Sequence, residues 1–80
     1  MKQTRILIAD DHSLVRMGLV SLIGYQKDME VVGEAENGEL AVEQALRLKP
    51  DMVIMDIMMP MLDGASATKR VLEALPSTKI

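Results

Sequence analysis

The chain has 80 residues, of which 49% are hydrophobic, and its single aromatic residue is Tyr25. This length sets a ceiling of one small domain, and the hydrophobic content excludes a disordered tail. Nine Lys and Arg against twelve Asp and Glu give a net charge of −3, which argues against nucleic-acid binding by this segment alone. Because cysteine and any apolar segment of signal or membrane-span length are absent, we expect a cytoplasmic protein that does not contact membranes.

The first half of the sequence alternates between strand and helix patterns. The continuous apolar run 5–9 predicts a strand that is covered on both faces. Helical spacing follows from Ser13, an expected N-cap, to Gly24, an expected C-terminal stop. Residues 29–35 alternate less cleanly and predict a strand near the edge of a sheet, and Asn37-Gly38 predicts a turn.

The second half repeats this alternation. Residues 39–48 have the spacing of an amphipathic helix, which Pro50 ends, and the apolar run 52–55 predicts a buried strand. Residues 65–75 predict a third helix, which is broken at Pro76, and residues 79–80 have the pattern of an opening fourth strand. Alternating strands and helices with short connections predict βαβ units and a parallel sheet.

Three carboxylates follow two of the predicted strands. Asp10 and Asp11 follow the strand 5–9, and Asp56 follows the strand 52–55. If these strands are neighbours, the acids converge, because the carboxyl ends of parallel strands share one edge of the sheet. Such acids repel one another unless a cation joins them, and we expect oxygen ligands alone, without histidine or cysteine, which suit Mg²⁺. A carboxylate beside Mg²⁺ is also a competent nucleophile toward phosphoryl groups, with which it forms an acyl phosphate.

These motifs resemble a known family when they are taken together and in order. The Asp10-Asp11 pair, Asp56, Met59-Pro60 and Asp63-Gly64 resemble the receiver domain of bacterial two-component response regulators. Residues 10–19 and 32–38 further resemble the subfamily with a C-terminal helix-turn-helix DNA-binding domain (LuxR/NarL/FixJ-like). The resemblance implies an α/β fold, a flavodoxin-like (CheY-like) doubly wound parallel sheet. Residues 1–80 would form about its first two thirds, to the start of strand four, without the remaining elements and any output domain.

The resemblance also implies a role for each site residue. Asp56 would accept the phosphoryl group from a sensor histidine kinase or from a small phosphodonor. Asp11, Asp56 and the backbone carbonyl of Met58 would ligate Mg²⁺ directly, Asp10 would act through water, and Pro60 would shape the loop. The Ser or Thr and the Lys that contact phosphoryl oxygens in the family would lie beyond this sequence. The protein would regulate transcription through its output domain, reach DNA only through that domain, and not be an enzyme with a metabolic product.

Several residues near the acids have a structural explanation instead. An aspartate after a strand is a common helix N-cap, which could explain Asp10 or Asp11 taken singly. Asp51 is expected in a turn and Asp63 at the cap of the third helix. His12 is expected to be a solvated neighbour rather than a catalytic group. Packing in gaps and burial in the loop are expected for four methionines: Met55, Met58, Met59 and Met61. Gly38 and Gly64 are expected in turns.

Two other functions fit parts of the sequence. A truncated pseudo-receiver would serve as a structural or dimerisation module without phosphotransfer. A Mg²⁺-dependent phosphohydrolase with Asp56 as nucleophile, similar to haloacid dehalogenase-like enzymes, would require an Asp where Met58 stands, and a much longer chain. Because a sheet that ends at a stub of strand four exposes an apolar edge, we expect a homodimer or a strand-exchanged oligomer.

Overall fold

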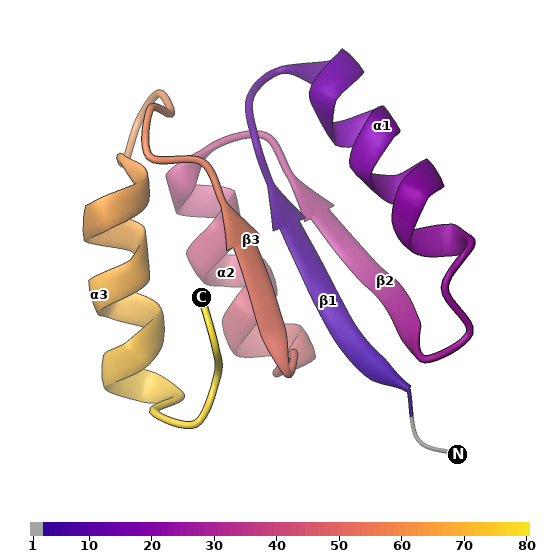
Figure 1. Cartoon of the computed structure of the whole chain (residues 1–80). Coiled ribbons are helices and arrows are strands. Elements are labelled where there is room, and N and C mark those ends of the chain that lie inside the picture. Colours follow the sequence, from indigo (N-terminus) through magenta and orange to yellow (C-terminus); the bar gives the residue numbers. More distant parts are fainter. Residues whose placement is uncertain (1–2) are drawn as a thin grey trace.

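The computed structural model describes residues 3–80, in which strands and helices alternate as predicted (Figure 1). The elements are the strands β1 (Thr4–Ala9), β2 (Met29–Ala35) and β3 (Met52–Met55) and the helices α1 (Ser13–Gly24), α2 (Gly38–Leu48) and α3 (Gly64–Ala74). Every element that the sequence predicts is present, and its boundaries lie within one residue of the expected ones.

The three strands form one parallel sheet in the order β2-β1-β3. The central strand β1 aligns Leu7 with Val53 of β3 and with Gly33 of β2. The register with β2 shifts between Ile6 and Leu7, where β2 carries one additional residue. The predictions that β2 lies at an edge and that the strands of the acidic residues are neighbours are therefore confirmed. This is the predicted doubly wound parallel arrangement, seen here over three strands.

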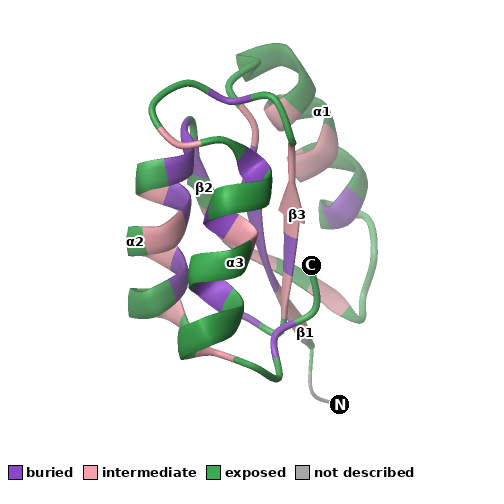
Figure 2. Ribbon diagram, turned by 90° about the vertical axis from the view of Figure 1, so that its left-hand side faces the viewer, coloured by how far each residue is buried: buried purple, intermediate pink, exposed green. Residues whose placement is uncertain are grey.

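The helices cover both faces of the sheet, which explains why β1 is apolar without alternation. Leu7 packs with residues of α2, β3 and α3, whereas Ile6 and Ile8 point to the opposite face and pack with Ile23 of α1. Figure 2 shows the resulting buried residues along β1 and on the inner sides of α2 and α3. Full burial of each large aliphatic side chain contributes about 1.5–3 kcal/mol. The central strand therefore anchors the residues that follow it.

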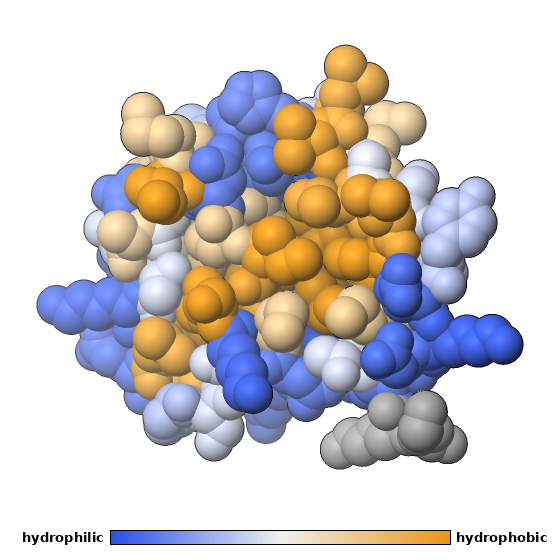
Figure 3. Space-filling model, in the orientation of Figure 1, coloured by the Kyte–Doolittle hydropathy of each residue, from blue (hydrophilic) through white to orange (hydrophobic). Residues whose placement is uncertain are grey.

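The two faces of the sheet are not equally covered. On the α1 side, Met52 and Ile54 of β3 are only partly buried, and Figure 3 shows a broad hydrophobic area on this face. Helix α1 itself exposes Leu14, Met17 and Leu22. At the outer edge of β3, Lys79 forms a single parallel bridge with Met52, which confirms the predicted opening of a fourth strand. The predicted homodimer or strand-exchanged oligomer stays a prediction.

Two helix starts differ from the expectation. Ser13 is not the N-cap of α1, because that position belongs to His12, whose side chain forms no capping hydrogen bond. Asn37, expected in a turn, is instead the N-cap of α2, and its Oδ1 accepts a hydrogen bond of 2.8 Å from Leu40 N. Asn37 satisfies a backbone N–H that the first turn of a helix leaves free, and it does so at a buried position.

Candidate functional site

The backbone of the sheet brings the acidic residues to one edge. Asp10 N donates a hydrogen bond of 3.0 Å to Ala35 O, and Asp56 N donates one of 2.9 Å to Ala9 O. These bonds continue the pairing of the strands beyond their last residues, so both acids leave the sheet at its carboxyl edge. Asp10, Asp11, His12 and Asp56 each offer a ligand atom, and these atoms lie within 4.8 Å of one another. We call these four residues the acidic cluster.

The carboxylates of the cluster combine partial burial with few partners. The side chains of Asp10 and Asp11 are 13% and 31% exposed. Asp56 Oδ1 accepts a hydrogen bond of 3.2 Å from Met58 N, and Asp10 Oδ1 accepts one of 2.8 Å from His12 N. Among the ion pairs of residues 3–80, none joins a Lys or Arg to these three carboxylates. Negative charge is therefore concentrated at a site that favours a cation.

His12 takes part in this cluster, which the sequence analysis did not anticipate. Its side chain is 68% exposed, as expected of a solvated residue. However, its Nδ1 lies 3.2 Å from Asp10 Oδ1 and 3.1 Å from Asp11 Oδ1. The expectation that the site offers oxygen donors alone is therefore wrong. The available signal was the position of His12, directly after two acids and directly before a helix.

Arg16 fixes the loop between β1 and α1, a role that sequence reasoning missed. Its Nη1 donates a hydrogen bond of 2.6 Å to Asp10 O, and its Nε donates one of 3.2 Å to Glu34 Oε1. The same residue begins the helical hydrogen bonding of α1, because Arg16 N donates to His12 O at 3.0 Å. Arg16 therefore ties the acidic loop to the end of β2 without pairing with the carboxylates of the cluster.

Two close approaches fix the loop between β3 and α3. A Cβ atom on Gly64 would overlap Asp56 O, and one on Gly38 would overlap Leu62 O. Neither glycine has a positive φ, so the expectation that they supply turn conformations is wrong, and both are required for space. Pro60 lies in a tight turn of this loop, in which Pro60 O accepts a hydrogen bond of 2.8 Å from Leu62 N.

The methionines of the loop do not share one environment. Met59 is buried against Ala9, Ala35 and Ala41, as predicted for packing. Met58 and Met61 are 78% and 80% exposed, so the prediction of loop burial is wrong for these two. Met58 thus reaches the cluster through its backbone, because its N–H contacts Asp56 while its side chain faces solvent.

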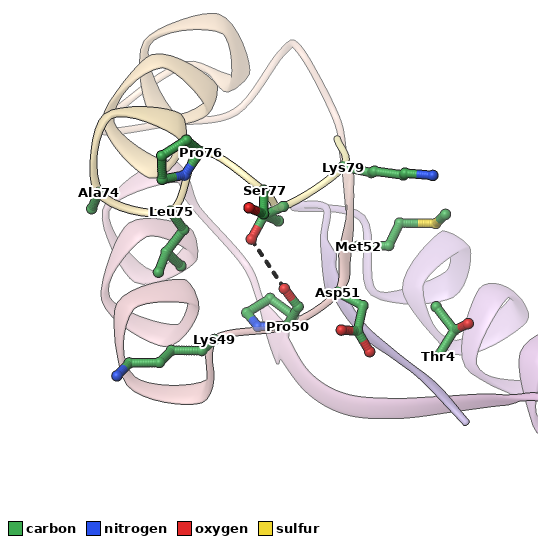
Figure 4. A pocket seen from close by; sticks show the side chains of 11 residues that line it. Thr4, Lys49, Pro50, Asp51, Met52, Ala74, Leu75, Pro76, Ser77 and Lys79 are labelled. Atoms are coloured by element: carbon green, nitrogen blue, oxygen red, sulfur yellow. Dashed lines mark hydrogen bonds between the residues drawn. The ribbon is translucent and has the colours of Figure 1, made fainter. Parts of the chain in front are cut away.

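Two other aspartates are structural, as predicted. Asp51 Oδ2 accepts a hydrogen bond of 2.8 Å from Arg5 N. Asp63 caps α3, and the hydrogen bonds from the backbone N–H and the hydroxyl of Ser66 lower the pKa of Asp63 from its ordinary value. Asp51 also lines an open hollow of about 610 Å³ at the opposite edge of the sheet, between the start of β3 and residues 74–79 (Figure 4). Thr78 Oγ1 donates a hydrogen bond of 3.1 Å to Pro50 O, and both residues line this hollow.

The donor set of the acidic cluster fits a divalent cation. Three carboxylates supply the hard oxygen ligands that Mg²⁺ takes, and the partial exposure of Asp11 leaves coordination positions to water. Among residues 3–80 this is the one place where at least three such side chains gather.

No helix in the described part of the chain is long and apolar enough to cross a membrane.

Comparison with known proteins places this geometry in context. Residues 6–80 match the model of the response regulator receiver domain. The chain is 45% identical over 76 residues to the transcriptional regulatory protein LiaR of Bacillus subtilis, and 43% identical to the response regulator protein VraR of Staphylococcus saprophyticus. Both matches cover 95% of this chain but only 36% of the relative, so the chain spans about a third of these relatives' length.

Solved structures show the same fold. The response regulator domain of Thermotoga maritima CheB superposes with a TM-score of 0.92 at 45% identity, over 95% of this chain and 57% of that chain. The signal receiver domain of NarL from Mycobacterium tuberculosis superposes with a TM-score of 0.89 at 30% identity, over 99% of this chain and 63% of that one. The expected resemblance is therefore confirmed for the fold and for the LuxR/NarL-type relatives.

Proposed function

Because the chain belongs to the response regulator receiver domain family, we propose that it is the phosphoacceptor part of a two-component signalling protein. In this proposal Asp56 accepts a phosphoryl group from the phosphohistidine of a sensor histidine kinase or from a small phosphodonor. The main support is the convergence of three carboxylates on one edge of the sheet without a Lys or Arg partner among the described residues.

Mg²⁺ is the cofactor that this proposal requires. Asp11, Asp56 and the backbone carbonyl of Met58 would hold the ion directly, and Asp10 would act through water. When bound, Mg²⁺ neutralises charge on the oxygens of the transferring phosphoryl group. The loop with Pro60 at its turn, packed through Gly64 against the backbone of Asp56, would keep the Met58 carbonyl in position.

The group of this chain that reacts in the transfer is a positioned carboxylate. An oxygen of Asp56 attacks the phosphorus atom, an O–P bond forms, and the N–P bond of the phosphohistidine breaks with its electron pair on the imidazole nitrogen. Asp56 N, bound to Ala9 O, fixes the backbone, and Met58 N–H orients the carboxylate. The product is an acyl phosphate on this chain, so the protein would be a substrate and switch rather than an enzyme that releases a metabolite.

The output is proposed to be control of transcription through a DNA-binding domain outside this chain. The support is the length and the naming of relatives: this chain covers 36% of LiaR, which is described as a transcriptional regulatory protein. This chain carries a net charge of −3, which suits a regulator of a DNA-binding domain better than a DNA-binding surface. Such a protein would act in the cytoplasm.

A pairing module without phosphotransfer is a second candidate. It is favoured by the partly buried Met52 and Ile54 and by the single bridge to Lys79 at the edge of β3, since partial coverage and a free strand edge invite association. The phosphohydrolase alternative gains no such support, because the side chain at position 58 is an exposed methionine rather than a second acid.

Intact mass before and after incubation with Mg²⁺ and a small phosphodonor tests the proposal. We expect a gain of one phosphoryl group that disappears when EDTA removes the ion or when Asp56→Asn removes the nucleophile. Asp51→Asn is the matched control, because it changes an acid at the other end of the same strand and should leave the gain intact. A folded sample that gains nothing, or an Asp56→Asn variant that still gains the group, would contradict the proposal.

A further inference from the structure

We propose that Arg16 is a positioning residue for the loop that carries Asp10 and Asp11, and that it acts through the geometry of its hydrogen bonds rather than through its charge. The inference rests on the proposed function, because it takes these acids as residues that hold a cation beside Asp56. It assigns a role to a side chain that forms no ion pair with the three carboxylates among the described residues.

The place of Arg16 near the start of α1 explains how it reaches the loop. Its backbone N–H donates a hydrogen bond of 3.0 Å to His12 O. Side chains of an α-helix lean toward its N-terminus, so the guanidinium extends back to the residues that precede α1. There its Nη1 donates at 2.6 Å to Asp10 O. One residue thus holds the loop at two points, through its backbone and through its side chain.

The backbone of Asp10 is fixed on both sides, and Arg16 supplies one of the two contacts. Asp10 N donates to Ala35 O at 3.0 Å, at the end of β2. Asp10 O accepts from Arg16 Nη1, and no other hydrogen bond within residues 3–80 reaches this oxygen. Because a peptide group is planar, a bond to its oxygen orients the whole unit as far as the start of Asp11. Arg16 therefore sets the direction in which the Asp11 side chain leaves the backbone.

The second contact of the guanidinium shows why an arginine is needed here. While Nη1 reaches Asp10 O, Nε donates at 3.2 Å to Glu34 Oε1 of β2. The Arg16 side chain is only 18% exposed, so these bonds lie partly out of water. Lysine carries the same charge on a single nitrogen, which cannot occupy both donor positions of the planar guanidinium. Geometry and charge can therefore be separated by substitution.

The two possible actions of Arg16 predict opposite changes in cation affinity. A positive charge near three carboxylates disfavours a further cation, so an arginine that acted through charge would weaken Mg²⁺ binding, and Arg16→Gln would tighten it. An arginine that orients the acids strengthens Mg²⁺ binding, and Arg16→Gln would weaken it. We expect the weaker binding, because the guanidinium is paired with Glu34 and is bonded to a backbone carbonyl rather than to the carboxylates of the cluster.

Calorimetric titration with Mg²⁺ tests the sign of this change. We expect the Kd of Arg16→Gln to rise about tenfold, as is typical when a residue that supports metal ligands is removed. Arg16→Lys, which keeps the charge, should also bind Mg²⁺ more weakly than the parent. Arg47→Gln is the matched control and should leave the Kd unchanged, since Arg47 is exposed and donates to Gln44 within α2. Tighter or unchanged binding by Arg16→Gln, or unchanged binding by Arg16→Lys, would overturn the proposal.

A second measurement needs no cation. In EDTA, ¹⁵N relaxation should give order parameters of about 0.85 for Asp11 and His12 in the parent, which fall toward about 0.6 in Arg16→Gln. Values near 0.6 in the parent would overturn the proposal without reference to the folding of a variant. If Arg16→Gln loosens the loop but Asp56 gains no phosphoryl group in the parent, the role of Arg16 in the loop stands and the proposed function fails. If Asp56 gains the group while loop order and Mg²⁺ affinity are independent of Arg16, only this inference fails.

Discussion

An aspartate stands next to each end of β3, and the two aspartates have different neighbours. Asp51, before the strand, is exposed but hydrogen-bonded to backbone groups: its Oδ2 accepts from Arg5 N at 2.8 Å, its N–H donates to Arg5 O, and its carbonyl accepts from Lys79 N. Asp56, after the strand, receives a hydrogen bond of 3.2 Å from Met58 N and lies beside two further carboxylates. Each carboxylate thus accepts one hydrogen bond from a backbone N–H, and the two ends differ in the like charges that surround Asp56.

The two aspartates are expected to affect the free energy of folding in opposite directions. A hydrogen bond to a charged group contributes about 1.5–3 kcal/mol, so Asp51 holds the starts of β1 and β3 together. Three carboxylates at one edge instead repel one another, and this repulsion opposes folding until a cation binds. Residue type alone does not distinguish the two ends, but the neighbouring carboxylates beside Asp56 do.

The largest effect is expected at Gly64, which packs against the backbone of Asp56. Gly64→Ala would place a Cβ on Asp56 O, so the loop or the helix must shift, and we expect a loss of about 2–3 kcal/mol in the free energy of unfolding. Urea denaturation measures this loss. Gly18→Ala is the control, because nothing lies within 4 Å of its added Cβ inside α1, and it should stabilise the chain by up to about 1 kcal/mol. Equal effects at both positions would show that the loop is not tightly packed on Asp56.

Substitutions at the two ends of β3 should change stability in opposite directions when no divalent cation is present. Asp51→Ala removes the acceptor of Arg5 N and should lower the free energy of unfolding by about 1–2 kcal/mol. Asp56→Asn keeps an oxygen for Met58 N but removes one of three like charges, and should raise this free energy by about 0.5–1 kcal/mol. Thermal and urea unfolding in EDTA measure both. Changes of the same sign would contradict the expectation that the two acids affect stability in opposite directions.

The smallest effect is expected at the exposed helix cap. Because hydrogen bonds from Ser66 lower the pKa of Asp63, the folded state favours the ionised carboxylate. Its contribution to stability is present above the unfolded pKa, close to 3.8, and is lost as the pH falls through the lower folded value. Asp63→Ala should therefore destabilise the chain at neutral pH, and the difference from the parent should shrink in acid. Urea midpoints across this pH range test it, and a difference that grows in acid would contradict the cap assignment.

Most of the fold could be predicted from the sequence because the signals were local and repeated. The apolar runs of β1 and β3, the helical spacing between them and the acids that follow each strand all depend on neighbouring residues. These signals place Asp10, Asp11 and Asp56 at one edge once β1 and β3 are adjacent. The sequence also separates Asp51 and Asp63 from the cluster, since Asp51 precedes its strand and Asp63 precedes a helix.

The remaining features depend on contacts between distant segments, which local patterns do not contain. Gly38 is required because Leu62 crosses the start of α2, and Arg16 is informative only once Glu34 lies beside it. His12 is exposed, as expected of a loop histidine, but its position beside Asp10 and Asp11 depends on how the loop leaves β1. Met58 is exposed although it is apolar, and its backbone N–H rather than its side chain contacts Asp56.

Titration of the ¹⁵N-labelled chain with Mg²⁺, followed by backbone amide NMR, tests the central claim most directly. We expect saturable shifts concentrated at residues 10–12 and 56–58, with no change at Arg5, Asp51 or Lys79. Asp56→Asn should weaken these shifts, whereas Asp51→Asn should leave them as they are. Shifts centred on Asp51, or a folded chain that shows none, would contradict the proposal that the Asp56 end of β3 is the functional one.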